Sequence, residues 1–146
     1  MNNHFYTWLA YLGALPFVLC ALLITNDHLH IYSLYNTFDV INSYALVITI
    51  FMSGIYWGIS LAREEPGLRA LLPVSNIITV LVWLTYLFLN SPYILLVYVV
   101  AFMFLVLIDF RLRKAGIITA YYFKLRCGVT AIVLASLLLT FVSLVQ

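Results

Sequence analysis

The sequence predicts an all-α integral membrane protein in which five helices cross the bilayer. Hydrophobic residues make up 66% of the 146 residues and charged residues only 8%, whereas about a quarter of the residues of a soluble domain are charged. The apolar residues also form five stretches of roughly 20 residues, the length that a helix needs to cross the hydrocarbon core. These stretches use nearly the whole chain, so we expect a single five-span domain over residues 1–146.

The basic residues predict how the bundle is oriented. All seven lie in two short gaps between the apolar stretches, and a five-span topology places both gaps on the same side of the membrane. Because Lys and Arg concentrate in cytoplasmic loops, we expect the N-terminus inside and the C-terminus outside. The first gap holds Arg63 and Arg69, and the second holds Arg111, Arg113, Lys114, Lys124 and Arg126.

The first predicted span covers residues 5–25. It contains Gly13 and Pro16, breaks that a helix in lipid tolerates when neighbouring groups satisfy the freed backbone. A cleaved signal peptide is the alternative. It is disfavoured because no basic region precedes the apolar stretch and no small-residue cleavage site follows it. We therefore expect a retained helix.

An external loop over residues 26–40 follows the first span. Its apolar and aromatic residues, without any Lys or Arg, predict a short helix that lies in the membrane interface. Asp27, His28 and His30 are conceivable metal ligands, but their spacing matches no established zinc motif. We expect no metal site there.

The remaining spans are separated by turns of different length. Pro66-Gly67 indicates a turn after the second span, and the short segment 90–92 makes the third and fourth spans antiparallel neighbours. Segment 111–126 is too long for a simple turn, so we expect it to lie along the inner headgroup layer, with Gly116 as the break from the fourth span. The predicted spans two to five are residues 41–62, 70–89, 92–110 and 127–145.

Small residues mark the second span as a packing element. Gly54 and Gly58 are four residues apart, a spacing that lets two helix backbones approach closely. Together with Trp57 they predict a helix-packing seam. We expect the seam to be used within the bundle, with association to a partner chain as the alternative.

Polar groups also recur along one face of the second span. Hydroxyls at this spacing either line a polar cavity or bond to their own or the next helix, and we favour the second interpretation. Asn76 in the third span must find partners for its amide, and we expect it to cap carbonyls freed by Pro73. The residues of the second-span stripe are Thr49, Ser53, Tyr56 and Ser60.

Asp109 lies at the inner end of the fourth span. A carboxylate near hydrocarbon is costly unless it is paired, and antiparallel fourth and fifth spans bring Asp109 and Arg126 to the same depth. We expect a structural ion pair between them. The functional alternative is a proton or ion relay, but this would need a second ionisable group deeper in the membrane, and the middles of the spans hold none.

Three segments resemble the family called domain of unknown function 3429. Residues 44–62 resemble the span of that family that contains glycine and tryptophan, although Tyr56 stands where the family tends to a small or basic residue. Residues 9–18 resemble its opening, and Asp109, Arg111 and Gly116 with residues 121–138 resemble its second marked region. The resemblance implies a small bacterial multi-pass inner-membrane protein with mitochondrial relatives and no assigned activity. It directs attention to Gly54, Trp57, Gly58, Asp109, Tyr122 and Arg126.

The sequence favours a function without catalysis. It has no nucleophile elbow, no phosphate-binding loop, no dinucleotide fingerprint and no pair of facing carboxylates, so we expect neither an enzyme nor a cofactor. The first hypothesis is a protein that packs against another membrane complex, assists its assembly, or associates with a second copy of itself. Because the basic residues are confined to one membrane face, a nucleic-acid partner is not expected.

Two other functions stay open. The chain could be a transporter or channel for a small neutral or lipid-like solute, with a polar interior formed by Ser53, Tyr56, Ser60 and Asn76. Alternatively, the inner basic loop could bind anionic lipid headgroups. The candidate headgroup ligands are Arg111, Arg113, Lys114, Lys124 and Arg126.

Overall fold

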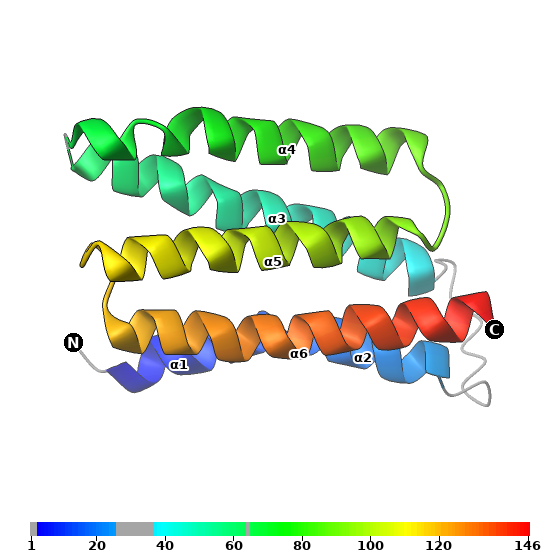
Figure 1. Ribbon diagram of the computed structural model, residues 1–146. Coiled ribbons are helices and arrows are strands. Elements are labelled where there is room, and N and C mark those ends of the chain that lie inside the picture. The colour runs from blue at the N-terminus through cyan, green and yellow to red at the C-terminus, as the bar shows by residue number, and fades with distance from the viewer. Residues whose placement is uncertain (1–2, 26–36, 64) are drawn as a thin grey trace.

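The computed structural model describes residues 3–25, 37–63 and 65–146, and the regular structure in this part of the chain is helical (Figure 1). Five helical segments are long and apolar enough to cross a membrane, which confirms the all-α, five-span class predicted from the sequence. The elements are α1 (Asn3–Leu12), α2 (Leu15–Thr25), α3 (Thr37–Ala62), the 3-10 helix η1 (Pro66–Leu68), α4 (Leu71–Phe88), α5 (Ile94–Lys114) and α6 (Ala120–Val145).

The outer surface of the bundle is apolar. Large hydrophobic side chains point outward from every spanning segment, and Phe88 is 82% exposed. In water such a surface would be an aggregation liability, whereas lipid solvates it. The exposed apolar side chains include Trp8, Phe51, Leu61, Phe88, Val100 and Leu139.

The first span is two helices rather than the single helix predicted over residues 5–25. α1 ends at Leu12 and α2 begins at Leu15, because Pro16 has no N–H to continue the ladder of hydrogen bonds. The carbonyl oxygen of Gly13 at this break accepts a hydrogen bond from the hydroxyl of Tyr44, at 2.9 Å. A side chain of α3 thus satisfies a backbone group of the broken helix, as membrane helices require.

The ends of other spans differ from the prediction. α3 begins at Thr37, so residues 37–40 are helical and not part of a loop; Asp39 in the first turn favours a helix start there. The predicted interfacial helix, with Asp27, His28 and His30, lies outside the described residues.

The inner basic segment also differs from the prediction. Segment 111–126 does not lie as a unit along the headgroups, because α5 continues to Lys114 and α6 already begins at Ala120. Basic side chains in a last helical turn interact favourably with the helix dipole, and their long stems let the charges reach water from the ends of a span. Only residues 115–119 link the two helices.

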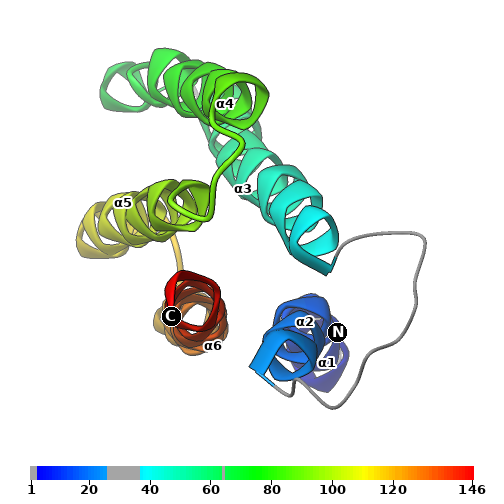
Figure 2. The same ribbon diagram turned by 90° about the vertical axis from the view of Figure 1, so that its right-hand side faces the viewer.

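α4 lies outside the four helices that surround the core. α2, α3, α5 and α6 pack around a common centre, while α4 packs against α3 and α5 on one side (Figure 2). Phe17 of α2 is fully buried and makes edge-on contacts with the rings of Tyr44 and Phe102, at centroid distances of 5.1 and 6.2 Å. Ile41, Tyr98, Leu105 and Leu137 complete the centre. Side chains therefore fill the middle of the bundle.

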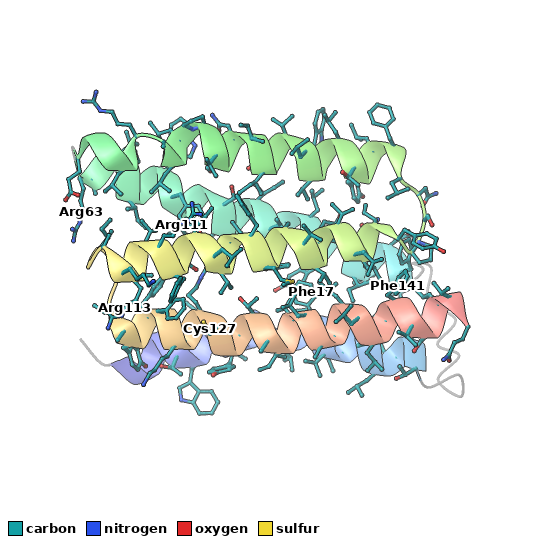
Figure 3. All side chains as sticks on the ribbon, viewed as in Figure 1. Phe17, Arg63, Arg111, Arg113, Cys127 and Phe141 are labelled. Carbon is teal, nitrogen blue, oxygen red and sulfur yellow. The ribbon has the colours of Figure 1, made fainter. Side chains whose placement is uncertain are left out.

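The two ends of the bundle differ in charge. The start of α1, the segment between α3 and α4, and the link between α5 and α6 lie at one end, and the C-terminus lies at the other (Figure 1). Arg63, Arg111 and Arg113 mark the first end in Figure 3. We call it the basic end, because the segments that meet there carry all seven Lys and Arg residues. That this end faces the cytoplasm stays a prediction.

Candidate functional site

A buried ion pair joins α5 to α6 near the basic end. The Nε atom of Arg126 donates to Oδ2 of Asp109 at 2.8 Å, and the two side chains are 6% and 2% exposed. Since α5 ends at Lys114 and α6 begins at Ala120, both members lie within about two helical turns of the basic end. Each charge alone would be costly in hydrocarbon, and the pair leaves no net charge.

α3 contributes two further partners to this ion pair. The hydroxyl of Tyr56 donates to the carbonyl oxygen of Leu105 at 2.8 Å and to Oδ1 of Asp109 at 3.0 Å. The Nη1 atom of Arg126 donates to the sulfur of Met52 at 2.9 Å. We call Tyr56, Asp109 and Arg126, with Met52, the polar cluster. It connects the consecutive helices α5 and α6 to α3, where Tyr56 lies 53 residues before Asp109.

The link between α5 and α6 holds the pair in register. Gly116 has a φ of +72°, a left-handed conformation that glycine adopts without steric cost. The N–H of Ile117 donates back to the carbonyl oxygen of Leu112 at 2.9 Å, the long hydrogen bond that ends many helices. Thr119 then caps α6, where its side chain accepts from the N–H of Tyr122 at 3.2 Å. The two helices are therefore antiparallel neighbours with a short, defined connection.

A second buried polar contact between α3 and α5 lies farther from the basic end than the polar cluster does. The hydroxyl of Tyr98 on α5 donates to Oδ1 of Asn42 on α3 at 2.8 Å. Tyr98 lies about 16 Å from Asp109 along the axis of α5, and Phe102 and Leu105 are buried between them. This arrangement suits a structural role for the cluster better than a relay of protons through the bundle.

The predicted hydroxyl stripe of α3 faces inward and forms hydrogen bonds. Ser53 and Ser75 bond to each other reciprocally. The hydroxyl of Ser53 donates to the carbonyl oxygen of Ser75 at 2.9 Å, and the hydroxyl of Ser75 donates to the carbonyl oxygen of Ser53 at 2.8 Å. Thr49 donates to the carbonyl oxygen of Ala45 in its own helix at 2.7 Å. Ser60 is buried as well. Within the stripe, Ser53 therefore joins α3 to α4, whereas Tyr56 joins α3 to α5.

The predicted glycine seam does not pack within the bundle. Gly54 and Gly58 are exposed on the outer face of α3, and a methyl group built at either one would meet no other atom within 4 Å. Trp57 beside them is 40% exposed. The preferred sequence interpretation was therefore wrong. The hydroxyl stripe occupies the inner face of the helix, so the glycines, which fall between its members, point outward.

Asn76 has a different partner from the one predicted. It does not cap the carbonyls freed by Pro73; its Oδ1 accepts a hydrogen bond from Nε1 of Trp57 at 3.2 Å. Asn76 is exposed on α4, so it lies outside the bundle and not in a polar interior with Ser53. The bond joins the outer faces of α3 and α4.

The candidate headgroup ligands separate into two groups. Arg111, Arg113, Lys114 and Lys124 are exposed at the basic end. Arg126 is buried in the polar cluster, so its assignment as a headgroup ligand was wrong. Its position on α6 turns it toward α5 and α3, where it neutralises the carboxylate.

Three residues that form polar contacts inside the bundle were not identified from the sequence. Met52 has no polar signature that would mark it as a partner of a guanidinium. Asn42 is detectable in principle, because it precedes Thr49 by two helical turns and so lies on the same face as the hydroxyl stripe. Its partner Tyr98 is one of 11 tyrosines, and nothing in its spacing distinguishes it from the others.

These features define the class of the protein. A bundle with an apolar outer surface, five spanning segments and its buried charges paired is a multi-pass α-helical membrane protein. Within the described residues, no three His, Cys, Asp or Glu side chains gather as a metal site would require.

The comparison with known families then assigns the chain more narrowly. The model of the family described as protein of unknown function (DUF3429) matches residues 3–142, nearly the whole chain, and the protein belongs to that family. The resemblance seen in the sequence is thereby confirmed. No curated protein and no solved structure matches the chain.

Proposed function

We propose that this protein is a non-enzymatic component or assembly factor of a membrane complex, and that it docks through the outer face of α3 and α4. We call the surface formed by Gly54, Trp57, Gly58 and Asn76 the docking face. The membrane we propose is the bacterial inner membrane, which rests on the family resemblance and on the basic end of the bundle.

The open glycines support this proposal. A glycine inside a helix costs roughly 0.5–1 kcal/mol relative to alanine, and neither Gly54 nor Gly58 offsets this cost by a close contact within the chain. In lipid, small residues at this spacing form a shallow groove into which a second helix can pack closely. A partner helix would use the space that the bundle leaves open.

The amide of Asn76 is the observation that carries the proposal. Its oxygen accepts from Trp57, but among the hydrogen bonds of the described residues its two N–H donors have no acceptor. An amide donor without a partner in hydrocarbon costs several kcal/mol. A carbonyl or hydroxyl group on a partner helix would remove this cost. The docking face thus combines room for a helix with a donor for that helix.

Replacing the glycines tests the proposal. Gly54→Leu with Gly58→Leu fills the groove, and the matched control is Ala131→Leu with Ala135→Leu, two exposed small residues at the same spacing on α6. We expect a stoichiometric partner to co-purify in mild detergent with the unchanged protein and the α6 variant, but not with the α3 variant. Recovery of a monomer alone from the unchanged protein would contradict the proposal, as would equal retention by both variants.

Asn76→Leu gives a second test, because it removes the amide and changes the side-chain volume little. We expect it to weaken association about tenfold, since a hydrogen bond in a membrane interface contributes on the order of 1–2 kcal/mol. A heterologous partner and a second copy of the chain are distinguished by the composition of the purified complex. Unchanged association would show that the amide of Asn76 does not contribute to the interface.

A further inference from the structure

A cationic pocket lies at the basic end, where α5 ends and α6 begins. Its volume is about 410 Å³, and it is lined by Phe110, Arg113, Lys114, Ala120, Phe123 and Lys124. Three of these six residues carry a positive charge and none carries a negative one. A concave site lined by one sign of charge attracts the opposite sign more strongly than a flat surface does.

Among the residues that the structure describes, these positive charges have no negative partner within ion-pair distance. The ion pairs in the described part of the chain join Arg63 to Glu65 and Arg126 to Asp109, and neither involves a residue of the pocket. Lys114 instead lies over the ring of Phe110, with Nζ 4.7 Å from the ring centroid. The pocket therefore gathers three cations whose repulsion a bound anion would relieve.

The start of α6, one of the two helix ends that border the pocket, adds to this preference. Ala120, the first residue of α6, lines the pocket, and the N-terminus of a helix carries a partial positive charge that favours anions. Lys124 lies close to the same helix end, where the dipole disfavours a cation. An anion placed between Lys124 and the start of α6 would interact favourably with both.

The walls of the pocket fit a lipid better than a free ion. The rings of Phe110 and Phe123 lie 6.0 Å apart, and an exposed apolar stripe continues along α5 through Leu107 and Met103. With Lys114, these α5 residues recur every three or four positions and so share one helix face. The charges thus stand at the end of the spans, and the apolar stripe runs from them toward the middle of the membrane.

We propose that this pocket binds the phosphate of an anionic membrane phospholipid. Arg113, Lys114 and Lys124 bind the phosphate, Phe110 and Phe123 contact the glycerol and the first methylene groups, and an acyl chain follows the stripe on α5. The proposal does not depend on the docking face, which lies on α3 and α4. The three cations could bind either a lipid phosphate or a free phosphate ion. The aromatic and apolar residues beside them favour the lipid.

The test compares two charge-matched double variants in detergent. Arg113→Gln with Lys124→Gln removes two charges from the pocket, whereas Arg69→Gln with Arg111→Gln removes two exposed charges at the same end that do not line it. Short-chain phosphatidylglycerol, phosphatidylcholine and inorganic phosphate are each titrated, and native mass spectrometry counts the bound molecules. Removing two charges that each contribute on the order of 1 kcal/mol weakens phosphatidylglycerol binding roughly thirtyfold.

The outcomes distinguish a specific binding site in the pocket from nonspecific electrostatic attraction to the basic end. We expect the thirtyfold loss in the pocket variant and an unchanged affinity in the control variant. Equal losses in both would overturn the proposal, and so would equal affinity of the unchanged protein for phosphatidylcholine. Binding of inorganic phosphate as tight as that of phosphatidylglycerol would overturn the assignment to a lipid. If the double variant does not fold, Lys114→Gln alone, at an exposed position, is expected to lose about fivefold.

Discussion

Arg126 on α6 and Asp109 on α5 form an ion pair with a 2.8 Å distance between Nε and Oδ2, and both side chains are almost completely buried. Tyr56 on α3 donates to Asp109, and Met52 on the same helix accepts from Arg126. The protein thus places its buried charges where three helices meet and leaves its other basic residues at the surface. This arrangement makes the cluster a stabilising element with strict requirements on each member.

Removing one member of the pair should destabilise the bundle strongly. Asp109→Leu leaves Arg126 buried without a counter-charge, and the loss of a buried partner costs about 3–5 kcal/mol. The double variant Asp109→Leu with Arg126→Met should recover most of this loss, because it buries no charge. Unfolding in mixed micelles measures the three free energies. A double variant as unstable as the sum of the single variants would show that the pair is not coupled.

Tyr56→Phe should destabilise the protein by about 1–3 kcal/mol. The change keeps the ring but leaves Oδ1 of Asp109 without its hydroxyl donor, and an unsatisfied buried acceptor carries that cost. Tyr93→Phe is the matched control, because Tyr93 is exposed and its ring contact with Phe141 does not need the hydroxyl. Thermal unfolding in detergent compares the two. Equal stability would contradict the role of the hydroxyl.

Gly116→Ala should destabilise the link between α5 and α6 by roughly 1–2 kcal/mol, because a left-handed backbone costs a residue with a Cβ about that much. Gly67→Ala is the control, since a methyl group there meets open space and its φ is not in the left-handed range. The free energy of unfolding of both variants provides the measurement. A tolerated alanine at Gly116 would mean that the link relaxes to another conformation.

Cysteine labelling distinguishes a packed interior from a solute pathway. In a background with Cys20→Ala and Cys127→Ala, Ser53→Cys and Ser60→Cys should resist an aqueous maleimide, because both positions are buried. Gly67→Cys, at an exposed position at the basic end, should react rapidly and serves as the control. Labelling of Ser53→Cys at a rate similar to that of Gly67→Cys would favour the transporter or channel hypothesis.

The sequence by itself determined the class of the protein. Five apolar stretches and seven basic residues in two gaps lead directly to a five-span bundle with one basic end, because length and hydropathy decide which helices can cross a bilayer. The position of Asp109 near hydrocarbon also made a charged partner necessary, and Arg126 was the residue that an antiparallel arrangement brings to the same depth. These inferences depend on solvation and on helix direction, and both can be deduced from the local composition of the sequence.

Only the tertiary structure decided which face of each helix is buried. In a soluble protein, the apolar face of a helix marks the core, but here the outer face of α3 meets lipid and its inner face carries hydroxyl groups, so hydropathy does not mark the core. The glycines at positions 54 and 58 were therefore assigned to the inside, although Tyr56 and Ser53 occupy it. Arg126 was likewise assigned two roles, as the partner of Asp109 and as a headgroup ligand, and only the packing of α3, α5 and α6 decided for the first.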